Sequence, residues 1–177
     1  VSNMSSSRAL RDITLKWGGK WYHSPVGEVN VVEAMKRVDA VIGGEGNGGV
    51  IYPPLHYGRD ALVGIALFLT LLAKKRIKCS ELRKTYPDYV ISKNRVDIDE
   101  GSDPERIIAA IEKSLGNEIT DRRDGILVEN EQGWVQVRKS NTESILRIYS
   151  EGRSEEEANL LAERIIKIVK KVTSGQK

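Results

Sequence analysis

The hydrophobic pattern of the chain changes near residue 88, and this change limits the folds that the chain can adopt. Before residue 88, helical and strand-like segments alternate, which is typical of an α/β layered domain. After it, several strand-like segments follow one another between two helical segments, which is typical of an α+β domain with a mainly antiparallel sheet. We therefore predict two domains, residues 1–88 and residues 89–177.

The first domain is predicted to contain three helices, two short strands, one loop with prolines and a second helix–loop region at 79–87. Spacing of the apolar residues places the helices at 5–19, 28–39 and 61–75, the strands at 20–24 and 40–44, and the loop at 52–60. The last of these helices is apolar on nearly all sides, which predicts burial on more than one face. Asp60 is its expected N-cap. No strand pattern precedes Ser5, so we expect this domain to be incomplete at its N-terminus, with its first strand upstream of the chain.

The second domain is predicted to contain four strands and two helices. The expected elements are a strand at 89–98, a helix that begins after 103 and ends at 116, three strands within 124–152, and a helix at 155–172. Asp103 is the expected N-cap of the first helix, and Pro104 suits its first position. Ser154 and Glu157 form a capping box that opens the second helix.

The composition excludes several classes of protein. The chain has 177 residues and a formal net charge of +3, which is too small and too evenly spread to indicate nucleic-acid binding. Its most apolar run, 61–73, is shorter than the roughly 20 residues that span a bilayer, so we expect no membrane segment. No signal peptide is visible and the single Cys79 permits the cytosol, so we expect a cytoplasmic protein. The chain begins with Val1 rather than methionine, as a fragment would.

The glycine-rich segment "GGEGNGGV", residues 43–50, follows an apolar run and is the first candidate site. Glycine tolerates positive φ and close approach to the backbone, and a loop after a strand is a natural ligand site in an α/β layer. Glu45 accepts hydrogen bonds, whereas Asn47 both donates and accepts, so the pair suits the vicinal hydroxyls of a sugar. A phosphate would be repelled by Glu45. The alternative is a tight turn that merely reverses the chain, and the pattern alone slightly favours it.

The segment "RKSNTES", residues 138–144, lies between two predicted strands and is the second candidate site. Its cations, hydroxyls and amide belong to Arg138, Lys139, Ser140, Asn141 and Thr142. Backbone N–H groups of a turn can form an anion-binding nest, and an arginine can fork onto phosphate oxygens. Arg147 in the next strand is expected on the same side as Arg138. The alternative is a polar hairpin turn, which the composition supports equally, and Glu143 argues mildly against an anion.

The remaining polar residues give weaker signals. His23 and His56 have no carboxylate or cysteine at ligand spacing, so we predict no metal site. The serines at 5–7 are interpreted as a helix cap, because no histidine is placed to activate one of them as a nucleophile. Arg59 lies close enough along the chain to reach the glycine-rich segment.

The two candidate segments in this order resemble those of the α-D-phosphohexomutases, the superfamily of phosphoglucomutase, phosphomannomutase and phosphoglucosamine mutase. "PVGEVNVVEAM" looks like the family's stretch ahead of its sugar loop, "GGEGNGG" like its sugar-recognition loop, and "RKSNTES" with a later arginine like its phosphate-binding loop. "YGRDALVGIALFL" also resembles the family. The resemblance covers nearly the whole chain, as the third domain without its start and the whole fourth domain.

The resemblance assigns roles to the polar residues of both segments. It implies that Glu45 and Asn47 bind hexose hydroxyls, and Glu28 stands where some relatives place a polar sugar contact. It implies that the phosphate that is not being transferred is held by Arg138, Lys139, Ser140, Asn141, Thr142 and Arg147.

Three positions depart from the family's pattern. Lys139 and Ser144 stand where many relatives have proline, so a more mobile loop and an additional phosphate partner are expected. Gly49 stands where several relatives have histidine, so that contact is expected to be absent.

The family's chemistry implies two further groups, a phosphoserine and a bound metal ion, that these residues do not supply. A phosphoserine in the first domain exchanges a phosphoryl group with the 1- or 6-position of a hexose through a bisphosphorylated intermediate, and Mg²⁺ held by the second domain neutralises the moving charge. Neither a phosphoserine loop nor an Asp-rich loop of the family's type occurs in the chain. The resemblance therefore implies no catalytic residue and no metal site here. The partners would be hexose mono- and bisphosphates and the remaining domains of a parent enzyme, and the chain alone would be inactive.

Two other functions remain open from the sequence. One is a complete, non-catalytic module that binds a sugar phosphate for regulation. The other is a nucleic-acid-binding α+β protein, because the sequence pI is about 8.9. The preferred hexose, whether glucose, mannose or glucosamine, is also left open.

Overall fold

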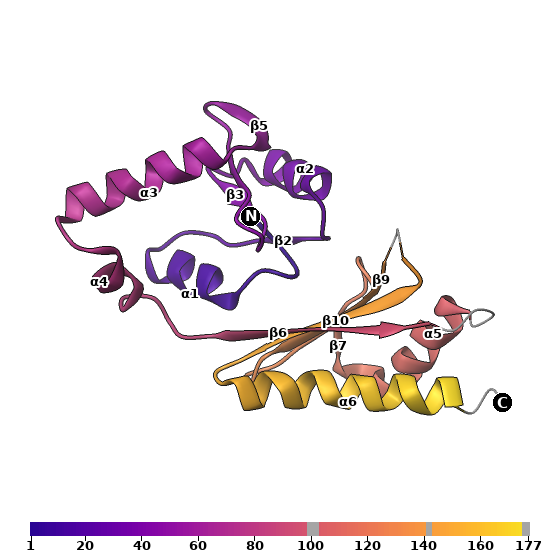
Figure 1. Ribbon diagram of the computed structural model, residues 1–177. Coiled ribbons are helices and arrows are strands. Elements are labelled where there is room, and N and C mark those ends of the chain that lie inside the picture. The colour runs from indigo at the N-terminus through magenta and orange to yellow at the C-terminus, as the bar shows by residue number, and fades with distance from the viewer. Residues whose placement is uncertain (99–102, 141–142, 175–177) are drawn as a thin grey trace. The chain divides into compact units, whose positions relative to one another are not determined.

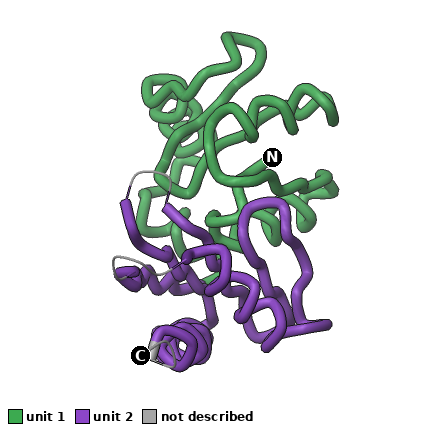
Figure 2. The backbone as a smooth tube through the Cα atoms, turned by 90° about the vertical axis from the view of Figure 1, so that its right-hand side faces the viewer, with its two compact units in different colours: residues 1–88 green, residues 89–177 purple. Residues whose placement is uncertain are grey.

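The structure of the protein is a computed structural model that describes residues 1–98, 103–140 and 143–174 (Figure 1). The chain divides into two compact units, Val1–Asp88 and Tyr89–Lys177, and each is described by itself (Figure 2). The predicted fold classes are confirmed, because the first unit combines helices with a mixed sheet and the second has an antiparallel sheet. Among the described helices, none combines the length and apolar character needed to cross a membrane.

The sheet of the first unit has the strand order β2-β1-β3-β4-β5. Its strands are β1 (Ser2–Asn3), β2 (His23–Ser24), β3 (Gly43–Gly44), β4 (Val50–Tyr52) and β5 (His56–Arg59). Strand β1 pairs in parallel with β2 and with β3, whereas β4 is antiparallel to β3 and to β5. The carboxyl ends of the three parallel strands therefore lie at one edge of the sheet.

The helices of the first unit are α1 (Arg8–Lys16), α2 (Glu28–Val38), α3 (Ala61–Lys75) and α4 (Cys79–Arg83). The expected caps are confirmed: Ser7 Oγ accepts the N–H of Ala9 at 3.1 Å, and Asp60 Oδ1 accepts the N–H of Val63 at 3.0 Å. Helix α2 packs against the sheet, and its buried side chains form most of a small core. The buried members of this core are Val31, Met35 and Ile51.

Contrary to the expectation of no strand before Ser5, Ser2 and Asn3 form β1 between β2 and β3. Both residues are polar and buried, with exposures of 1% and 5%. The indole Nε1 of Trp21 donates to Ser2 Oγ at 3.0 Å, so the buried hydroxyl is satisfied. A polar strand of two residues carries no apolar alternation, which is the signal by which a sequence reveals a strand.

Two other predictions for the first unit are corrected by the backbone pairing. Within the predicted buried strand at 40–44, Gly43 and Gly44 pair as β3, whereas Val41 is 79% exposed. The predicted loop at 52–60 contains most of a hairpin, because β4 and β5 pair across the turn that holds the prolines. Prolines therefore marked the turn correctly, but strands of three and four residues were too short to be recognised beside it.

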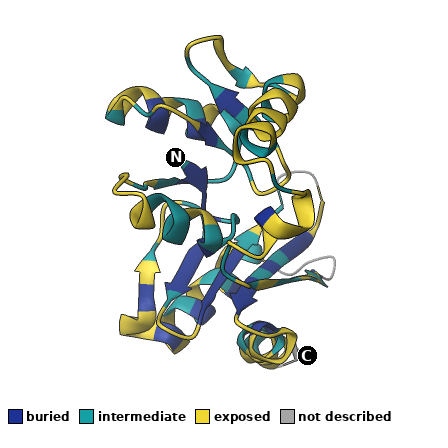
Figure 3. Ribbon diagram, turned by 90° about the vertical axis from the view of Figure 1, so that its left-hand side faces the viewer, coloured by how far each residue is buried: buried dark blue, intermediate teal, exposed yellow. Residues whose placement is uncertain are grey.

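The prediction that helix α3 is buried on more than one side is wrong. None of its residues is buried (Figure 3). Leu62 and Leu69 are 77% and 56% exposed. Its main contact is with β4. An apolar helix becomes buried all round only where other surfaces cover it, and within the first unit α3 has the sheet as its principal neighbour.

The sheet of the second unit has the strand order β6-β10-β9-β8-β7, and all neighbouring strands are antiparallel. Its strands are β6 (Val90–Asp97), β7 (Ile119–Asp121), β8 (Ile126–Glu129), β9 (Trp134–Lys139) and β10 (Ile145–Gly152). Its helices are α5 (Pro104–Leu115), the 3-10 turn η1 (Gly116–Glu118) and α6 (Glu155–Ser174). The predicted strands and both predicted helices are confirmed, and β7 is an additional strand.

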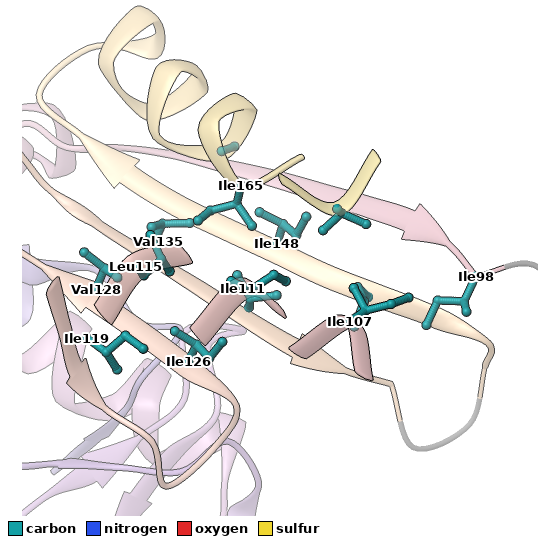
Figure 4. Packing of buried hydrophobic residues seen from close by; sticks show 14 residues of the cluster. Ile98, Ile107, Ile111, Leu115, Ile119, Ile126, Val128, Val135, Ile148 and Ile165 are labelled. Atoms are coloured by element: carbon teal, nitrogen blue, oxygen red, sulfur yellow. The ribbon is translucent and has the colours of Figure 1, made fainter. Parts of the chain in front are cut away.

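One face of this sheet packs against α5 and α6 and forms the core of the second unit (Figure 4). The cluster contains 14 buried residues drawn from the sheet, both helices and the adjoining loops. Val135 and Val137 of β9 belong to it, as their alternation predicted. Leu146 and Ile148 of β10 also belong to it, so Arg147 between them points to the opposite face of the sheet.

Candidate functional site

Three loops at the carboxyl ends of β1, β2 and β3 meet around the side chain of Glu45. Asn3 Nδ2 donates to Glu45 Oε1 at 3.1 Å, and the backbone N–H of Gly27 donates to the same oxygen at 3.3 Å. A Cβ on Gly46 would lie 2.9 Å from the backbone oxygen of Ser5, so the glycine-rich loop packs directly on the loop after β1. The predicted site thus lies at the strand ends, where α/β folds commonly bind ligands.

Arg59 of β5 joins this loop cluster from the other side. Its Nη1 donates to Glu45 Oε2 at 3.0 Å, so both oxygens of that carboxylate are bonded within the protein. The Glu45 side chain is accordingly only 6% exposed. The proximity of Arg59 to the loop was expected from the sequence, whereas its ion pair with Glu45, which orients this predicted sugar-binding carboxylate, was not.

Glu28 shares the same arginine. Its Oε2 accepts from Arg59 Nε at 2.9 Å, and its Oε1 accepts from the backbone N–H of Arg59 at 2.9 Å. The backbone hydrogen bond, followed by the guanidinium, holds the pKa of Glu28 below its usual value. With 35% of its side chain exposed, Glu28 is more open to solvent than Glu45.

The glycine-rich loop closes on itself as a tight turn. The N–H of Glu45 donates to the oxygen of Gly49 at 2.9 Å, and Gly48 has a φ of +94°. Asn47 Oδ1 accepts the N–H of Gly49 at 3.1 Å, while Asn47 itself is exposed. The segment is therefore a tight turn, and this turn leaves the polar side chain of Asn47 exposed to solvent.

Gly49 is needed for a second reason. A Cβ at this position would lie 2.5 Å from Cδ of Arg59 and 3.0 Å from its Cγ. The arginine is held at its far end by two carboxylates, so it has little freedom to move aside. Glycine at 49 and arginine at 59 are thus a matched pair, in which the arginine occupies the space that a side chain on the loop would take.

The second candidate segment begins at the end of β9. Arg138 and Lys139 are consecutive strand residues, so their side chains leave opposite faces of the sheet. Lys139 forms an ion pair with Glu105 in the first turn of α5, and this hydrogen bond raises the pKa of Lys139. The structure therefore separates two cations that the sequence analysis grouped together.

Arg147 lies on the same face as Arg138, directly opposite it in the β9–β10 pairing. Its Nη2 donates to Ser140 Oγ at 3.4 Å and to Glu143 Oε2 at 3.3 Å. Arg147 thereby links the loop to the sheet. Asn141 and Thr142, which were also predicted to bind phosphate, lie outside the described residues.

Asn3 is a further residue of the first site, and it was not predicted from the sequence. Asn3 bonds Glu45 through its amide nitrogen, and its Oδ1 accepts from the N–H of Ser5 and the hydroxyl of Ser6. A polar residue two positions ahead of a serine run was the available signal, but it indicates an ordinary turn equally well. In the described parts of the chain, no group of three histidine, cysteine or carboxylate side chains is arranged to hold a metal ion.

Comparison with known proteins gives the same family over both units. The family model for phosphoglucomutase/phosphomannomutase, alpha/beta/alpha domain III, matches residues 1–89. The model for the phosphoglucomutase/phosphomannomutase C-terminal domain matches residues 95–168. These two matches together cover nearly all of the chain.

Relatives of known sequence are about two and a half times longer, since the chain spans 38% of their length. The chain is 35% identical to a phosphoglucomutase/phosphomannomutase of Thermococcus kodakarensis, over 99% of this chain. It is 34% identical to a phosphoglucosamine/phosphogalactosamine mutase of Sulfurisphaera tokodaii, over 96% of this chain.

Solved structures share the fold at lower identity. A phosphoglucomutase/phosphomannomutase family protein from Burkholderia thailandensis superposes with a TM-score of 0.76 at 22% identity, over 96% of this chain and 37% of that one. An N-acetylphosphoglucosamine mutase of Aspergillus fumigatus, solved with glucose 1,6-bisphosphate, gives a TM-score of 0.70 at 19% identity, over 97% of this chain and 38% of that one.

Proposed function

Because the chain belongs to the phosphoglucomutase/phosphomannomutase family, we propose that it forms the sugar- and phosphate-binding part of a longer hexose-phosphate mutase. The reaction moves a phosphoryl group between the 1- and 6-positions of a hexose through a phosphoserine and a bisphosphorylated intermediate. The names of the relatives favour a phosphoglucosamine mutase or a phosphomannomutase/phosphoglucomutase. The observation that carries this proposal is the family match over both units, with one polar loop in each.

The first unit is proposed to recognise the hexose through its hydroxyls. Glu45 is already oriented by Asn3 and Arg59, and such preorganisation lowers the entropic cost of binding a ligand. Asn47 presents its amide at the surface, and Glu28 keeps part of its carboxylate exposed. Acceptors and a donor on one small surface suit the hydroxyl groups along one edge of a sugar.

The second unit is proposed to hold the phosphate that is not being transferred. Arg138 and Arg147 share one face of the sheet and supply planar guanidinium groups, which bind phosphate oxygens in pairs. Ser140 is in contact with Arg147 and adds a hydroxyl. The proposal also includes Lys139, Asn141 and Thr142; Lys139 would have to leave Glu105 in order to take part.

The chain's own residues position the substrate rather than transfer the phosphoryl group. A divalent cation generally neutralises the charge that moves in such reactions. The described residues offer no cluster of ligands for it, so we propose that Mg²⁺ is bound by another part of the longer enzyme. The proposed partners are hexose mono- and bisphosphates and the remaining domains, without nucleic acid or membrane, and the proposed location is the cytoplasm. The 177-residue chain alone is expected to show no mutase activity.

Calorimetric titration of the chain with glucose 6-phosphate and glucosamine 6-phosphate tests the proposal. Arg138→Gln is expected to weaken binding of both by about tenfold or more, because a charged hydrogen bond is worth about 1.5–3 kcal/mol. Asn47→Ala is expected to weaken binding of the sugar phosphates and to leave binding of inorganic phosphate unchanged. Equal affinity of wild type and both variants for every ligand would show that neither loop is a binding site.

A further inference from the structure

Three arginines stand in line across the sheet of the second unit. Strand β10 lies between β6 and β9, and Arg147 on β10 pairs with Arg95 on β6 and with Arg138 on β9. Residues directly opposite each other in antiparallel strands point to the same face, with Cα atoms roughly 4.5–5.5 Å apart. Arg95, Arg147 and Arg138, the arginine row, therefore occupy neighbouring positions on one face of the sheet.

The row lies on the face that the helices leave open. Leu146 and Ile148, on either side of Arg147, belong to the core formed with α5 and α6. Side chains alternate along a strand, so Arg147 and the two arginines opposite it point away from that core. Arg95 is exposed, and the other two arginines are partly exposed, so an ion from solution has access to them.

Such an arrangement is unfavourable in the absence of an anion. Like charges directly opposite each other destabilise a sheet. Among the described residues, the carboxylate bonded to the row is Glu143, at 3.3 Å from Arg147. Lys93 and Asp97 are on the same face of β6, one on each side of Arg95, and their charges offset each other. The three positively charged guanidinium groups therefore have one carboxylate bonded to them among the described residues.

Arg138 provides an independent sign of a missing partner. Its Nε is buried and has no hydrogen-bond partner. A buried donor left unsatisfied costs free energy, so native proteins usually provide an acceptor. An oxyanion bound by the exposed nitrogens of the row would neutralise the excess charge, and a shift of the Arg138 side chain on binding would bring its Nε to such an acceptor.

We propose that Arg95 completes an anion site with Arg147 and Arg138, and that the ligand is a doubly charged phosphate group. The inference rests on the proposed function, in which Arg138 and Arg147 hold the phosphate of a hexose phosphate, and it adds a third cation from a different strand. Neither the candidate loop nor the sequence pattern pointed to Arg95, because its place beside Arg147 follows only from the strand register.

The proposal predicts opposite effects of Arg95→Gln on stability and on binding. Without ligand, the variant is expected to unfold about 1–5 °C higher than wild type, because one like-charge contact is removed. Its affinity for inorganic phosphate and for glucose 6-phosphate is expected to fall about tenfold, because a charge-assisted hydrogen bond is lost. Residues that are merely structural would lower stability when replaced and would not change affinity.

Lys93→Gln is the matched control. It removes the same charge from the same strand and face, but Lys93 lies opposite Tyr149, with its Nζ 5.6 Å from the ring centroid. We expect no gain in stability, because the variant loses the contact with the Tyr149 ring, and an affinity within about twofold of wild type, because Lys93 is not opposite an arginine of the row. Arg95→Lys keeps the charge without the planar fork and is expected to bind with intermediate affinity.

The experiment combines thermal unfolding of the chain with titration of inorganic phosphate and glucose 6-phosphate, at constant ionic strength set with chloride. An affinity of Arg95→Gln equal to that of wild type, while Arg138→Gln binds weakly, would overturn the role of Arg95 and leave the proposed function intact. Failure of wild type to bind either ligand would overturn both. A rise in unfolding temperature together with the loss of affinity, absent from the Lys93 control, is the result that supports the site.

Discussion

The two units of the chain are nearly equal in length, but they are built in different ways. The second unit has a core of 14 buried residues between its sheet and two helices, whereas the first has a buried core of Val31, Met35 and Ile51. Among the described residues, all the exposed large hydrophobic side chains except Val90 and Leu160 belong to the first unit. Hydrophobic burial therefore stabilises the second unit far more than the first.

The first unit is held together to a greater extent by polar contacts at its strand ends. Its buried polar residues include Ser2, Asn3 and Ser24, and its Glu45 carboxylate accepts hydrogen bonds from Asn3, Gly27 and Arg59. Hydrogen bonds of this kind contribute only about 0.5–1.5 kcal/mol each in net terms, but leaving a buried partner unsatisfied costs more. The glycine-rich loop is therefore part of what orders the first unit, whereas the segment after β9 is attached to a sheet that has its own apolar core.

The largest expected effect is a difference between two leucine truncations. Leu115→Ala at the end of α5 removes a side chain that is 3% exposed and is expected to destabilise the second unit by about 2–5 kcal/mol. Leu69→Ala in α3 removes one that is 56% exposed and should change stability by about 0.5 kcal/mol or less. Both changes in stability are measured by urea unfolding, with amide signals from each unit as the probe. Equal losses of stability for the two variants would contradict the greater hydrophobic stabilisation of the second unit.

An intermediate effect is expected at the contact between Gly49 and Arg59. Gly49→Ala alone is expected to destabilise the first unit by about 1–3 kcal/mol, because its Cβ would collide with an arginine that cannot move aside. In the Arg59→Ala background the colliding atoms are absent, so the same change should cost much less. The coupling is measured by a double-mutant cycle. Simple additivity would show that the arginine does not fix the loop, and the second unit should be unaffected throughout.

The smallest effect concerns stability in acid, and one carboxylate with a lowered pKa is compared from each unit. The hydrogen bonds from Arg59 to Glu28 lower the pKa of Glu28, and those from Arg164 to Glu118 lower the pKa of Glu118. A carboxyl whose folded pKa lies below its usual value of 4.5 stabilises the fold above that pH, and this stabilisation is lost as the pH falls through the folded pKa. Glu28→Gln should reduce the loss of stability of the first unit at low pH and leave the second unit unchanged. Glu118→Gln should reduce the loss of stability of the second unit and leave the first unchanged. Unfolding measured from pH 6 down to about pH 3 checks this, and a change in the wrong unit would contradict it.

Capped, periodic elements were predictable from the sequence. Ser7 and Asp60 cap α1 and α3 as expected, and the alternation of Val135 and Val137 placed β9 correctly against the core. These predictions succeed because caps and periodicity are local properties of a sequence.

Features that depend on strand pairing or on neighbouring elements of the fold were not predictable from the sequence. Strand β1 is a polar pair recognised only by its neighbours, and the burial of α3 depends on what covers it. The proposed role of Glu45 and Asn47 followed from their hydrogen-bonding groups and from the family resemblance, but the bond from Arg59 to Glu45 depends on the position of β5. The proposed place of Arg95 beside Arg147 rests on the strand register, which no local sequence pattern specifies.

The most direct test of the account is an amide chemical-shift titration of the 177-residue chain with glucose 6-phosphate and, separately, with inorganic phosphate. Glucose 6-phosphate is expected to shift amides in both residues 43–49 and residues 138–147, whereas inorganic phosphate is expected to shift those in 138–147 and around Arg95. If glucose 6-phosphate leaves residues 43–49 unshifted while it binds elsewhere, the glycine-rich loop is only a turn and the division of roles between the two units is wrong.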